Sequence, residues 1–320
     1  MKTRISVWCV LVLGVLSLWG CPSSNEHKGV RENAKEVNQN LVTDATGITF
    51  TMPANFSRLV SLVPYLTDDL KILDAESRLI GKTDYCKAKA EIASIGNMLD
   101  PSLEKIAVLK PDLVLASKEG NRPGVVEKLR EMKIPVFVFG ECTTWNNIKS
   151  DFFLLGRLIG KEKEAGEIIS QIQAELDAIG AEKSTVQPGA EKKTGINGSP
   201  ILPKVFVQLN IRPLMSAGRN TFINEIITMA QGHNIAAASI LPWPTMNTEE
   251  IIRINPDVII VSEMGQMTED AKKIWSEEQY AGVEAVKNNR VFVMEADLLC
   301  QPTPRNFINA VKKLREYLDY

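Results

Sequence analysis

The sequence predicts an α/β protein of two similar lobes, each built around a parallel sheet. The first observation behind this prediction is an internal repeat, because residues 102–117 align without a gap on residues 247–262. Each copy has a glutamate near its start, a Pro-Asp pair seven residues after that glutamate, and then an apolar run. This order is typical of a short helix, a break at the proline and a strand buried on both faces. A unit that recurs once at about half the chain's length indicates a duplicated lobe rather than a solenoid.

The second observation is that strand and helix patterns alternate in both halves, as in a parallel sheet. We also expect Thr67 to cap the helix that follows the first strand. The expected strands are 58–64, 78–81, 135–139, 204–209 and 290–295, and the expected helices are 124–132, 220–229 and 305–318.

The third observation is a long helical periodicity in the middle of the chain, with apolar residues at three- and four-residue spacings from Phe152 to Leu176. It predicts one long backbone helix that joins the lobes. The expected segments are a signal peptide (1–20), a lipidated cysteine with a flexible stalk (21–57), a first lobe (58–145), the linking helix (146–183), a flexible linker (184–203) and a second lobe (204–320).

The N-terminus reads as an export signal. Two basic residues precede an apolar run that is too short for a comfortable membrane span. The motif Leu18-Trp-Gly-Cys21 resembles a bacterial lipobox, in which the cysteine is acylated and becomes the mature N-terminus. The alternative is an uncleaved N-terminal anchor. In both cases the chain is exported and tethered to a bacterial membrane, on its periplasmic or outer cell-surface side.

Composition excludes several classes of protein. The formal net charge of -2 gives no reason to expect a nucleic-acid partner. The two histidines, His27 and His233, are too few for a histidine-rich metal site, and no Gly-rich phosphate loop or Gly-x-Ser-x-Gly motif is present. We therefore expect no catalytic residues and no cofactor. Cys86, Cys142 and Cys300 allow at most one disulfide, and the sequence does not select the pair.

Two lobes create a cleft, and a cleft between lobes is where ligands usually bind. Trp243 lies in a Pro-Trp-Pro sequence, which favours a rigid platform for a ligand over the alternative of core packing. Tyr85 has the same two interpretations, and Asp297 is expected to make a polar contact. The predicted ligand-binding residues are Tyr85, Cys86, Met98, Asn121, Trp243, Asp297 and Leu298.

Glu104 and Glu249 occupy matching positions in the two copies of the repeat. One interpretation is purely structural, because a carboxylate in the first turn of a helix is stabilised by the helix dipole. The other is that the pair docks on matching arginines of a partner with two-fold symmetry.

Taken together, the two Glu-x6-Pro-Asp motifs, the middle helix and the lipobox resemble solute-binding proteins of ABC importers that have a helical backbone between Rossmann-like lobes. That family carries cobalamin, heme and iron-siderophore complexes. Segments 79–85, 205–213, 241–244 and 297–305 are most similar to its cobalamin-binding branch. The resemblance implies a monomer that delivers a corrinoid to an ABC permease dimer. It also implies that Tyr85, Trp243 and Asp297 contact the corrinoid and that Glu104 and Glu249 dock the permease.

Three positions depart from the cobalamin-binding pattern. Met98 and Ser117 stand where aromatic rings are expected, and Gln301 stands where an arginine is expected. Fewer rings and one lost cation predict a reshaped pocket, so a different corrinoid, heme or another chelate remains an alternative ligand.

For heme, the axial ligand would come from Tyr85, Cys86, Met98 or Cys300. A siderophore is less favoured because the proposed pocket lacks an arginine cluster. Outside this family, a cell-surface enzyme would use Cys86 or Cys300 as nucleophile and would need His233 to activate it. A purely structural lipoprotein would bind no ligand.

Overall fold

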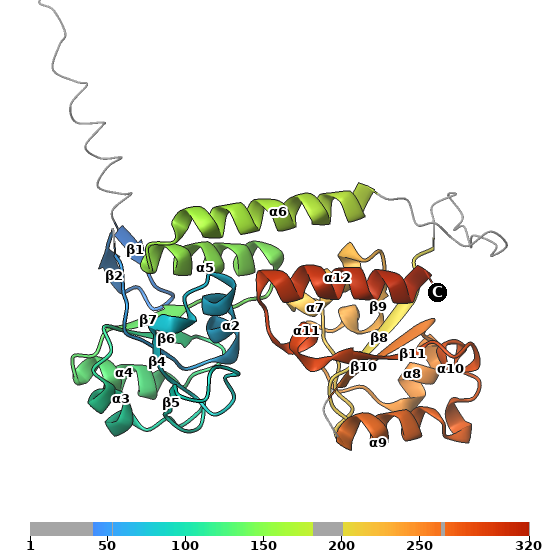
Figure 1. Cartoon of the computed structure of the whole chain (residues 1–320). Coiled ribbons are helices and arrows are strands. Elements are labelled where there is room, and N and C mark those ends of the chain that lie inside the picture. The colour runs from blue at the N-terminus through green and yellow to red at the C-terminus, as the bar shows by residue number, and fades with distance from the viewer. Residues whose placement is uncertain (1–40, 53, 182–200, 264–265, 320) are drawn as a thin grey trace, which may run out of the picture. The chain divides into compact units, whose positions relative to one another are not determined.

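The computed structural model describes residues 41–52, 54–181, 201–263 and 266–319 (Figure 1). The predicted signal peptide, the lipidation site Cys21, the first part of the stalk and residues 184–200 of the linker lie outside the described residues.

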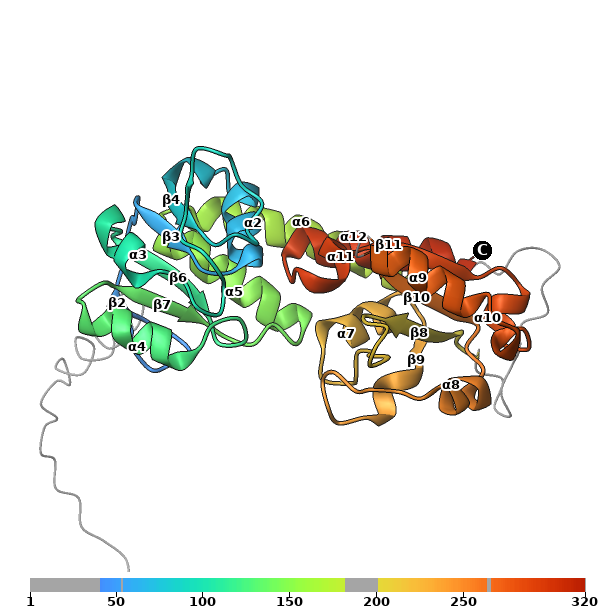
Figure 2. The same cartoon turned by 90° about the horizontal axis from the view of Figure 1, so that it is seen from below.

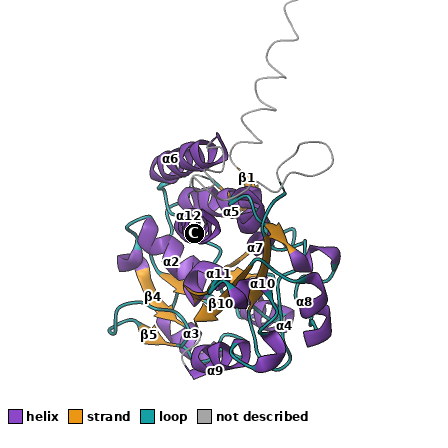
Figure 3. Ribbon diagram, turned by 90° about the vertical axis from the view of Figure 1, so that its right-hand side faces the viewer, coloured by secondary structure: helices purple, strands orange, loops and turns teal. Residues whose placement is uncertain are grey.

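The first lobe contains a five-stranded parallel sheet. Figure 3 shows helices, in purple, around the strands, in orange. All five residues of the interior strand β6 are buried, as expected for a parallel sheet that is covered on both sides. The sheet order is β5 (Ala93–Ser94), β4 (Leu79–Lys82), β3 (Leu59–Ser61), β6 (Leu113–Ser117) and β7 (Val136–Phe139). Its helices are α2 (Pro64–Ile72), η1 (Glu76–Arg78), α3 (Leu103–Leu109) and α4 (Pro123–Glu131).

The second lobe repeats this architecture on a four-stranded parallel sheet. The sheet order is β11 (Val291–Glu295), β10 (Val258–Glu263), β8 (Lys204–Gln208) and β9 (His233–Asn234). Its helices are α7 (Phe222–Met229), η2 (Ile235–Ala238), α8 (Thr248–Ile254), α9 (Gln266–Trp275), η3 (Glu278–Tyr280), α10 (Glu284–Lys287), α11 (Ala296–Cys300) and α12 (Pro304–Asp319). The predicted α/β class with two parallel sheets is confirmed.

The sequence repeat corresponds to the same local structure in each lobe. Its helices, α3 and α8, begin at side-chain caps: Ser102 accepts a hydrogen bond from a backbone N–H of α3, and Asn247 does the same for α8. Both helices end at a residue in the left-handed conformation, Lys110 (φ 48°) and Asn255 (φ 56°). The proline that follows prevents the helix from continuing.

The Pro-Asp pair that both copies of the repeat share also has a structural reason. The carboxylate of Asp112 accepts the backbone N–H of Arg58 (3.0 Å), and that of Asp257 accepts the backbone N–H of Lys204 (2.7 Å). Each aspartate therefore fixes the chain where it enters the neighbouring strand, β3 or β8.

The prediction of one long linking helix is wrong. The segment forms two helices, α5 (Trp145–Leu158) and α6 (Glu162–Ala181), which pack against each other (Figure 1). Gly160 adopts the left-handed conformation (φ +68°), and the N–H of Lys161 bonds back to the carbonyl of Gly156 (2.7 Å). The apolar periodicity runs on through this turn because both helices bury an apolar stripe, so the periodicity alone hides the break.

The lobes are joined at Trp145, the first residue of α5. Its ring stacks on Phe307 of α12 with centroids 5.2 Å apart, and its Nε1–H donates to Oε1 of Gln173 on α6 (2.7 Å). Its backbone N–H donates to the carboxylate of Glu225 on α7. Helix α6 lies beside α12 of the second lobe (Figure 1 and Figure 2). Helices α5 and α6 therefore meet α7 and α12 of the second lobe at one residue, Trp145.

The stalk predicted for 21–57 is corrected at its C-terminal end, because β1 (Leu41–Thr43) and β2 (Thr49–Thr51) form an antiparallel hairpin on the first lobe. Val42 is buried, and the hairpin's Asp44 pairs with Arg130 (2.5 Å) and accepts the backbone N–H of Val138 (3.2 Å). These contacts cover the exposed edge of β7.

The cap predicted at Thr67 is wrong. Helix α2 begins three residues earlier at Pro64, whose fixed φ suits the first helical position. Thr67 is fully buried inside the helix, and its hydroxyl donates to the carbonyl of Val63 (3.4 Å).

Candidate binding site

Most of the predicted ligand-binding residues lie beyond the carboxyl ends of the parallel strands, which is where open α/β sheets bind their ligands. Tyr85 follows β4, Met98 follows β5 and Asn121 follows β6 in the first lobe. In the second lobe Asp297 follows β11 directly, and Trp243 lies in the loop between η2 and α8.

Two large aromatic side chains are displayed on the surface, one from each lobe. Tyr85 is 60% exposed and Trp243 is 45% exposed, whereas large aromatic residues are usually mostly buried. Beside Trp243, Ile240 and Leu241 are also exposed, and Leu99 is exposed in the first lobe. Trp243 is therefore not a core residue, and both rings are available to a flat apolar ligand.

The loop that carries Trp243 is clamped by backbone hydrogen bonds to residues 214–218. The N–H groups of Ser216 and Gly218 donate to the carbonyls of Pro244 and Pro242, each at 2.9 Å. An ideal Cβ at Gly218 would lie 2.1 Å from the carbonyl oxygen of Leu241, so only glycine allows this approach. The exposed Trp243 ring is thus mounted on a fixed backbone.

Asn121 and Cys86, which were predicted to contact the ligand, make structural contacts in the first lobe. The Asn121 side chain accepts the N–H of Ser117 (2.9 Å) and donates to the carbonyl of Met98 (3.1 Å), which ties two loops together. Cys86 is buried, and its thiol contacts the Thr83 hydroxyl at 3.2 Å. Asn121 is 7% exposed and Cys86 is 3% exposed, so both are less accessible to a ligand than Tyr85 and Trp243.

Met98 and Leu298 are half-buried and pack against the apolar core. Each keeps part of its side chain at the surface, so each remains a proposed contact at the edge of the site.

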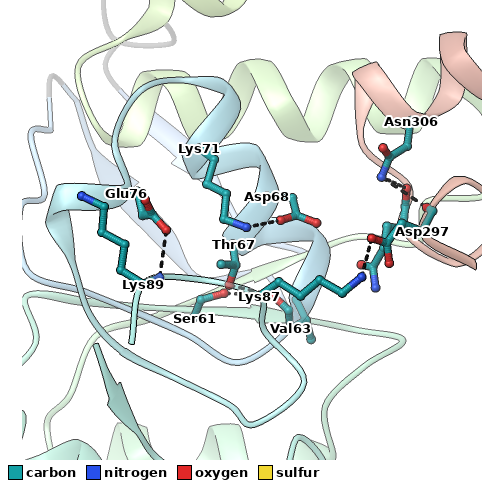
Figure 4. A network of polar contacts seen from close by, with 11 residues as sticks. Ser61, Val63, Thr67, Asp68, Lys71, Glu76, Lys87, Lys89, Asp297 and Asn306 are labelled. Atoms are coloured by element: carbon teal, nitrogen blue, oxygen red, sulfur yellow. Dashed lines mark hydrogen bonds and ion pairs between the residues drawn. The ribbon is translucent and has the colours of Figure 1, made fainter. Parts of the chain in front are cut away.

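Asp297 has a partner that sequence reasoning missed. Its Oδ2 lies 2.6 Å from Nζ of Lys87, a residue of the other lobe and of the loop that carries Tyr85 (Figure 4). The main-chain carbonyl of Asp297 accepts Nδ2–H of Asn306 (3.2 Å), which fixes the aspartate on α11. The one sequence signal for Lys87 is its place two residues after Tyr85.

A buried cluster of acidic groups lies at the carboxyl end of the first sheet, between α2, α5 and the loop after β7. Burial raises the pKa of Asp151 to about 6 and raises the pKa of the Cys142 thiol, whose Sγ lies 3.8 Å from Oδ2 of Asp151. Burial also raises the pKa of Asp69 and of the Tyr65 hydroxyl well above their ordinary values. The Asp151 carboxyl is therefore mostly protonated below pH 6, and its ionisation above that pH is opposed by burial.

Glu104 and Glu249 are exposed and lie in the first turns of α3 and α8. Each helix also exposes an apolar residue within one turn of its glutamate, Val108 on α3 and Ile252 on α8. The glutamates match between the lobes, whereas the exposed apolar residues occupy different positions of the repeat, because Val108 aligns with Arg253.

Across the part of the chain that the structure describes, no three His, Cys, Asp or Glu side chains gather closely enough to hold a metal ion. In the same residues no helix combines the length and the apolar character needed to span a membrane.

Residues 59–298 match the model of the family described as periplasmic binding protein. The chain belongs to this family. Across its members the ligand is captured for transport, so the protein is a substrate-binding protein that works outside the cytoplasm with an ABC transporter, and it is not an enzyme.

Individual relatives differ in what they bind. The chain is 27% identical over 99% of its length to the uncharacterized ABC transporter substrate-binding lipoprotein YvrC of Bacillus subtilis, of which it covers 97%. It is 24% identical over 82% of its length to the vitamin B12-binding protein of Vibrio parahaemolyticus, of which it covers 89%. A periplasmic heme-binding protein solved with two hemes has the same fold, with a TM-score of 0.68, 20% identity and coverage of 82% of this chain and 97% of that one.

The clamp behind Trp243 leads to the first prediction. Gly218→Ala forces its new methyl group against the Leu241 carbonyl, so we expect a loss of about 1–3 kcal/mol in the free energy of unfolding. Denaturant unfolding of Gly218→Ala and of the natural protein measures this difference. The control is Gly124→Ala in α4, where a Cβ meets nothing within 4 Å; it should unfold no more easily than the natural protein. Equal stability of both variants would show that the clamp does not hold the loop.

The acidic cluster leads to the second prediction. The ordinary pKa of an Asp carboxyl is 3.8, and burial raises the pKa of Asp151 to about 6 in the folded protein, so the folded state binds more protons between these values. Stability should therefore fall as the pH rises from about 4 to 6, by at most about 3 kcal/mol for this group. Asp151→Asn should flatten that decline and stabilise the protein at pH 7.5.

Thermal unfolding across this pH range checks the prediction. The exposed Asp100→Asn change is the matched control and should leave the pH profile as it is. If the stability of Asp151→Asn fell as much with rising pH as that of the natural protein, another group would be the cause.

Proposed function

We propose that the protein is a lipid-anchored binding protein that captures a cobalamin-type corrinoid and delivers it to an ABC permease. The observation that carries the proposal is the pair of exposed rings, Tyr85 and Trp243, displayed from different lobes at the carboxyl side of each sheet. Relatives named vitamin B12-binding proteins, such as that of Vibrio parahaemolyticus, support the choice of ligand.

The chemistry of the site suits a corrinoid. The macrocycle offers broad apolar faces to Tyr85 and Trp243, and its peripheral amides offer N–H donors to a carboxylate. Asp297 supplies that carboxylate on a backbone held by Asn306. Ser117, at a position where an aromatic ring was expected, is buried and contributes no surface to the pocket, so the proposed site depends on fewer rings.

Heme is the second candidate ligand. The observation in its favour is the exposed phenol of Tyr85, which is free to approach an iron atom in the site. Cys86 is buried and is therefore a less accessible axial ligand than Met98 or Cys300. A heme-binding protein of the same fold makes this alternative worth a direct test.

The membrane anchor is proposed at Cys21, because Leu18-Trp-Gly-Cys21 matches a lipobox in three of its four positions and the related YvrC is named a lipoprotein. We propose that the anchored protein is a monomer. Incorporation of labelled palmitate into the natural protein but not into Cys21→Ser tests the anchor.

The third prediction concerns the ligand. Titration of the purified full chain with cyanocobalamin, followed by calorimetry, should show saturable binding, and Trp243→Ala should weaken that binding about tenfold because a stacking surface is lost. Trp243→Phe keeps a ring and should lose less. A parallel titration with hemin, followed by its visible spectrum, should show no saturable change. Saturable binding of hemin alone, abolished in Tyr85→Phe, would replace the corrinoid by heme.

The fourth prediction concerns delivery. Glu104→Ala combined with Glu249→Ala should leave ligand affinity unchanged and abolish uptake in cells, because both docking carboxylates are removed while the site is untouched. Glu127→Ala on α4 removes an equally exposed carboxylate and is the control. Normal uptake by the double variant would contradict the docking assignment.

A further inference from the structure

The ion pair between Lys87 and Asp297 spans the two lobes at the proposed site. Nζ and Oδ2 are 2.6 Å apart, although the residues are 210 positions apart in the chain. Both side chains reach solvent, at 73% exposure for Lys87 and 42% for Asp297. In Figure 4 the lysine extends from the first lobe toward α11 of the second, and no other labelled side chain makes this crossing.

The two partners differ in how firmly they are held. Asp297 lies in the first turn of α11, where its main-chain carbonyl accepts hydrogen bonds from Gln301 (3.0 Å) and Asn306 (3.2 Å). Lys87 is an exposed residue with four rotatable side-chain bonds, in a loop anchored by Cys86 and by the bond from the Lys89 N–H to Glu76 (3.2 Å). The acid is therefore the fixed partner, and the lysine is the group that moves.

The surrounding charges favour the same arrangement. Asp297 is the nearest carboxylate to Lys87 and raises the pKa of its ammonium group, and Asp68 adds to this at longer range. Asp68 is itself paired with Lys71 at 2.8 Å, so it does not draw Lys87 away from Asp297. Lys87 thus points across to the second lobe rather than back to its own.

We propose that Lys87 and Asp297 form a latch that ties the lobes together in the ligand-free protein and that an incoming ligand must open. The statement that an incoming ligand opens the latch rests on the proposed function, in which the Asp297 carboxylate accepts N–H groups of the ligand. The ammonium group covers the Oδ2 side of the carboxylate, so a ligand whose N–H groups approach that oxygen must displace it. Lys87 is therefore a positioning residue that competes with the ligand and favours ligands able to displace it.

The latch is weak by construction. Exposed ion pairs shift an equilibrium by about 1.4- to 5-fold and are screened by salt. A ligand that gains several contacts on both lobes can displace such a pair, and added salt should open it without a ligand.

The first experiment needs no ligand. Keto-bearing residues placed at Val108 and Ile252, both exposed, accept donor and acceptor dyes in the full chain without using its cysteines. Energy transfer should fall in Lys87→Met and stay unchanged in Lys89→Met, which removes a neighbouring positive charge that points away from Asp297 in Figure 4. Lys87→Asp combined with Asp297→Lys should restore it. Equal transfer in the natural protein and in Lys87→Met would overturn the latch.

The second experiment measures cyanocobalamin association by stopped-flow fluorescence. Lys87→Met should bind cyanocobalamin about two- to fivefold faster than the natural protein. Added salt should speed up binding by the natural protein but not by Lys87→Met, and Lys89→Met should behave like the natural protein in both respects. Slower or weaker binding by Lys87→Met would show that Lys87 holds the ligand and would overturn the competition. If no variant binds cyanocobalamin while the energy transfer changes as expected, the latch stands and the corrinoid assignment fails.

Discussion

The contacts of Trp145 are the constraint on which the rest of the structure depends. One residue stacks on Phe307, bonds to Gln173 and donates its backbone N–H to Glu225, so it touches α12, α6 and α7 at once. The stacked pair is buried, and buried aromatic pairs are worth about 0.5–1.5 kcal/mol beyond their area. Because this cluster holds the helices between the lobes, it sets where the two proposed binding surfaces stand.

Each lobe then contributes its part of the site by the same means. The repeat provides a capped helix, a left-handed stop and an aspartate that fixes the next strand, and the parallel strands deliver their loops to one edge of each sheet. The rigid parts of the site are in these loops: the clamped backbone around Trp243 and the bonded carbonyl of Asp297. The movable part is the side chain of Lys87. A fixed site with one mobile cation suits a protein that must hold a large ligand and then release it to a permease.

The fold could be predicted from the sequence wherever a local pattern has one physical meaning. The two copies of the repeat each specify a helix and a buried strand, and both were placed correctly. The break between α5 and α6 was missed because Gly160 interrupts neither helix's apolar stripe. The hairpin at 41–52 was missed because its strands are only three residues long. What orders it is the pair of Asp44 with Arg130, which is distant in the sequence.

The site was less predictable because contacts between segments that are far apart in the sequence form it. Tyr85, Trp243 and Asp297 could be named from their positions and from the resemblance, but burial of Cys86 and the bonds of Asn121 depend on loops that meet only in the folded chain. Lys87 was missed because its partner lies 210 residues away, which no spacing reveals.

The most direct test of the account is a crystal structure of the protein with cyanocobalamin. The account predicts a macrocycle between Tyr85 and Trp243, within hydrogen-bond distance of Asp297 and with Lys87 turned away. A ligand bound on another face of either lobe would contradict it.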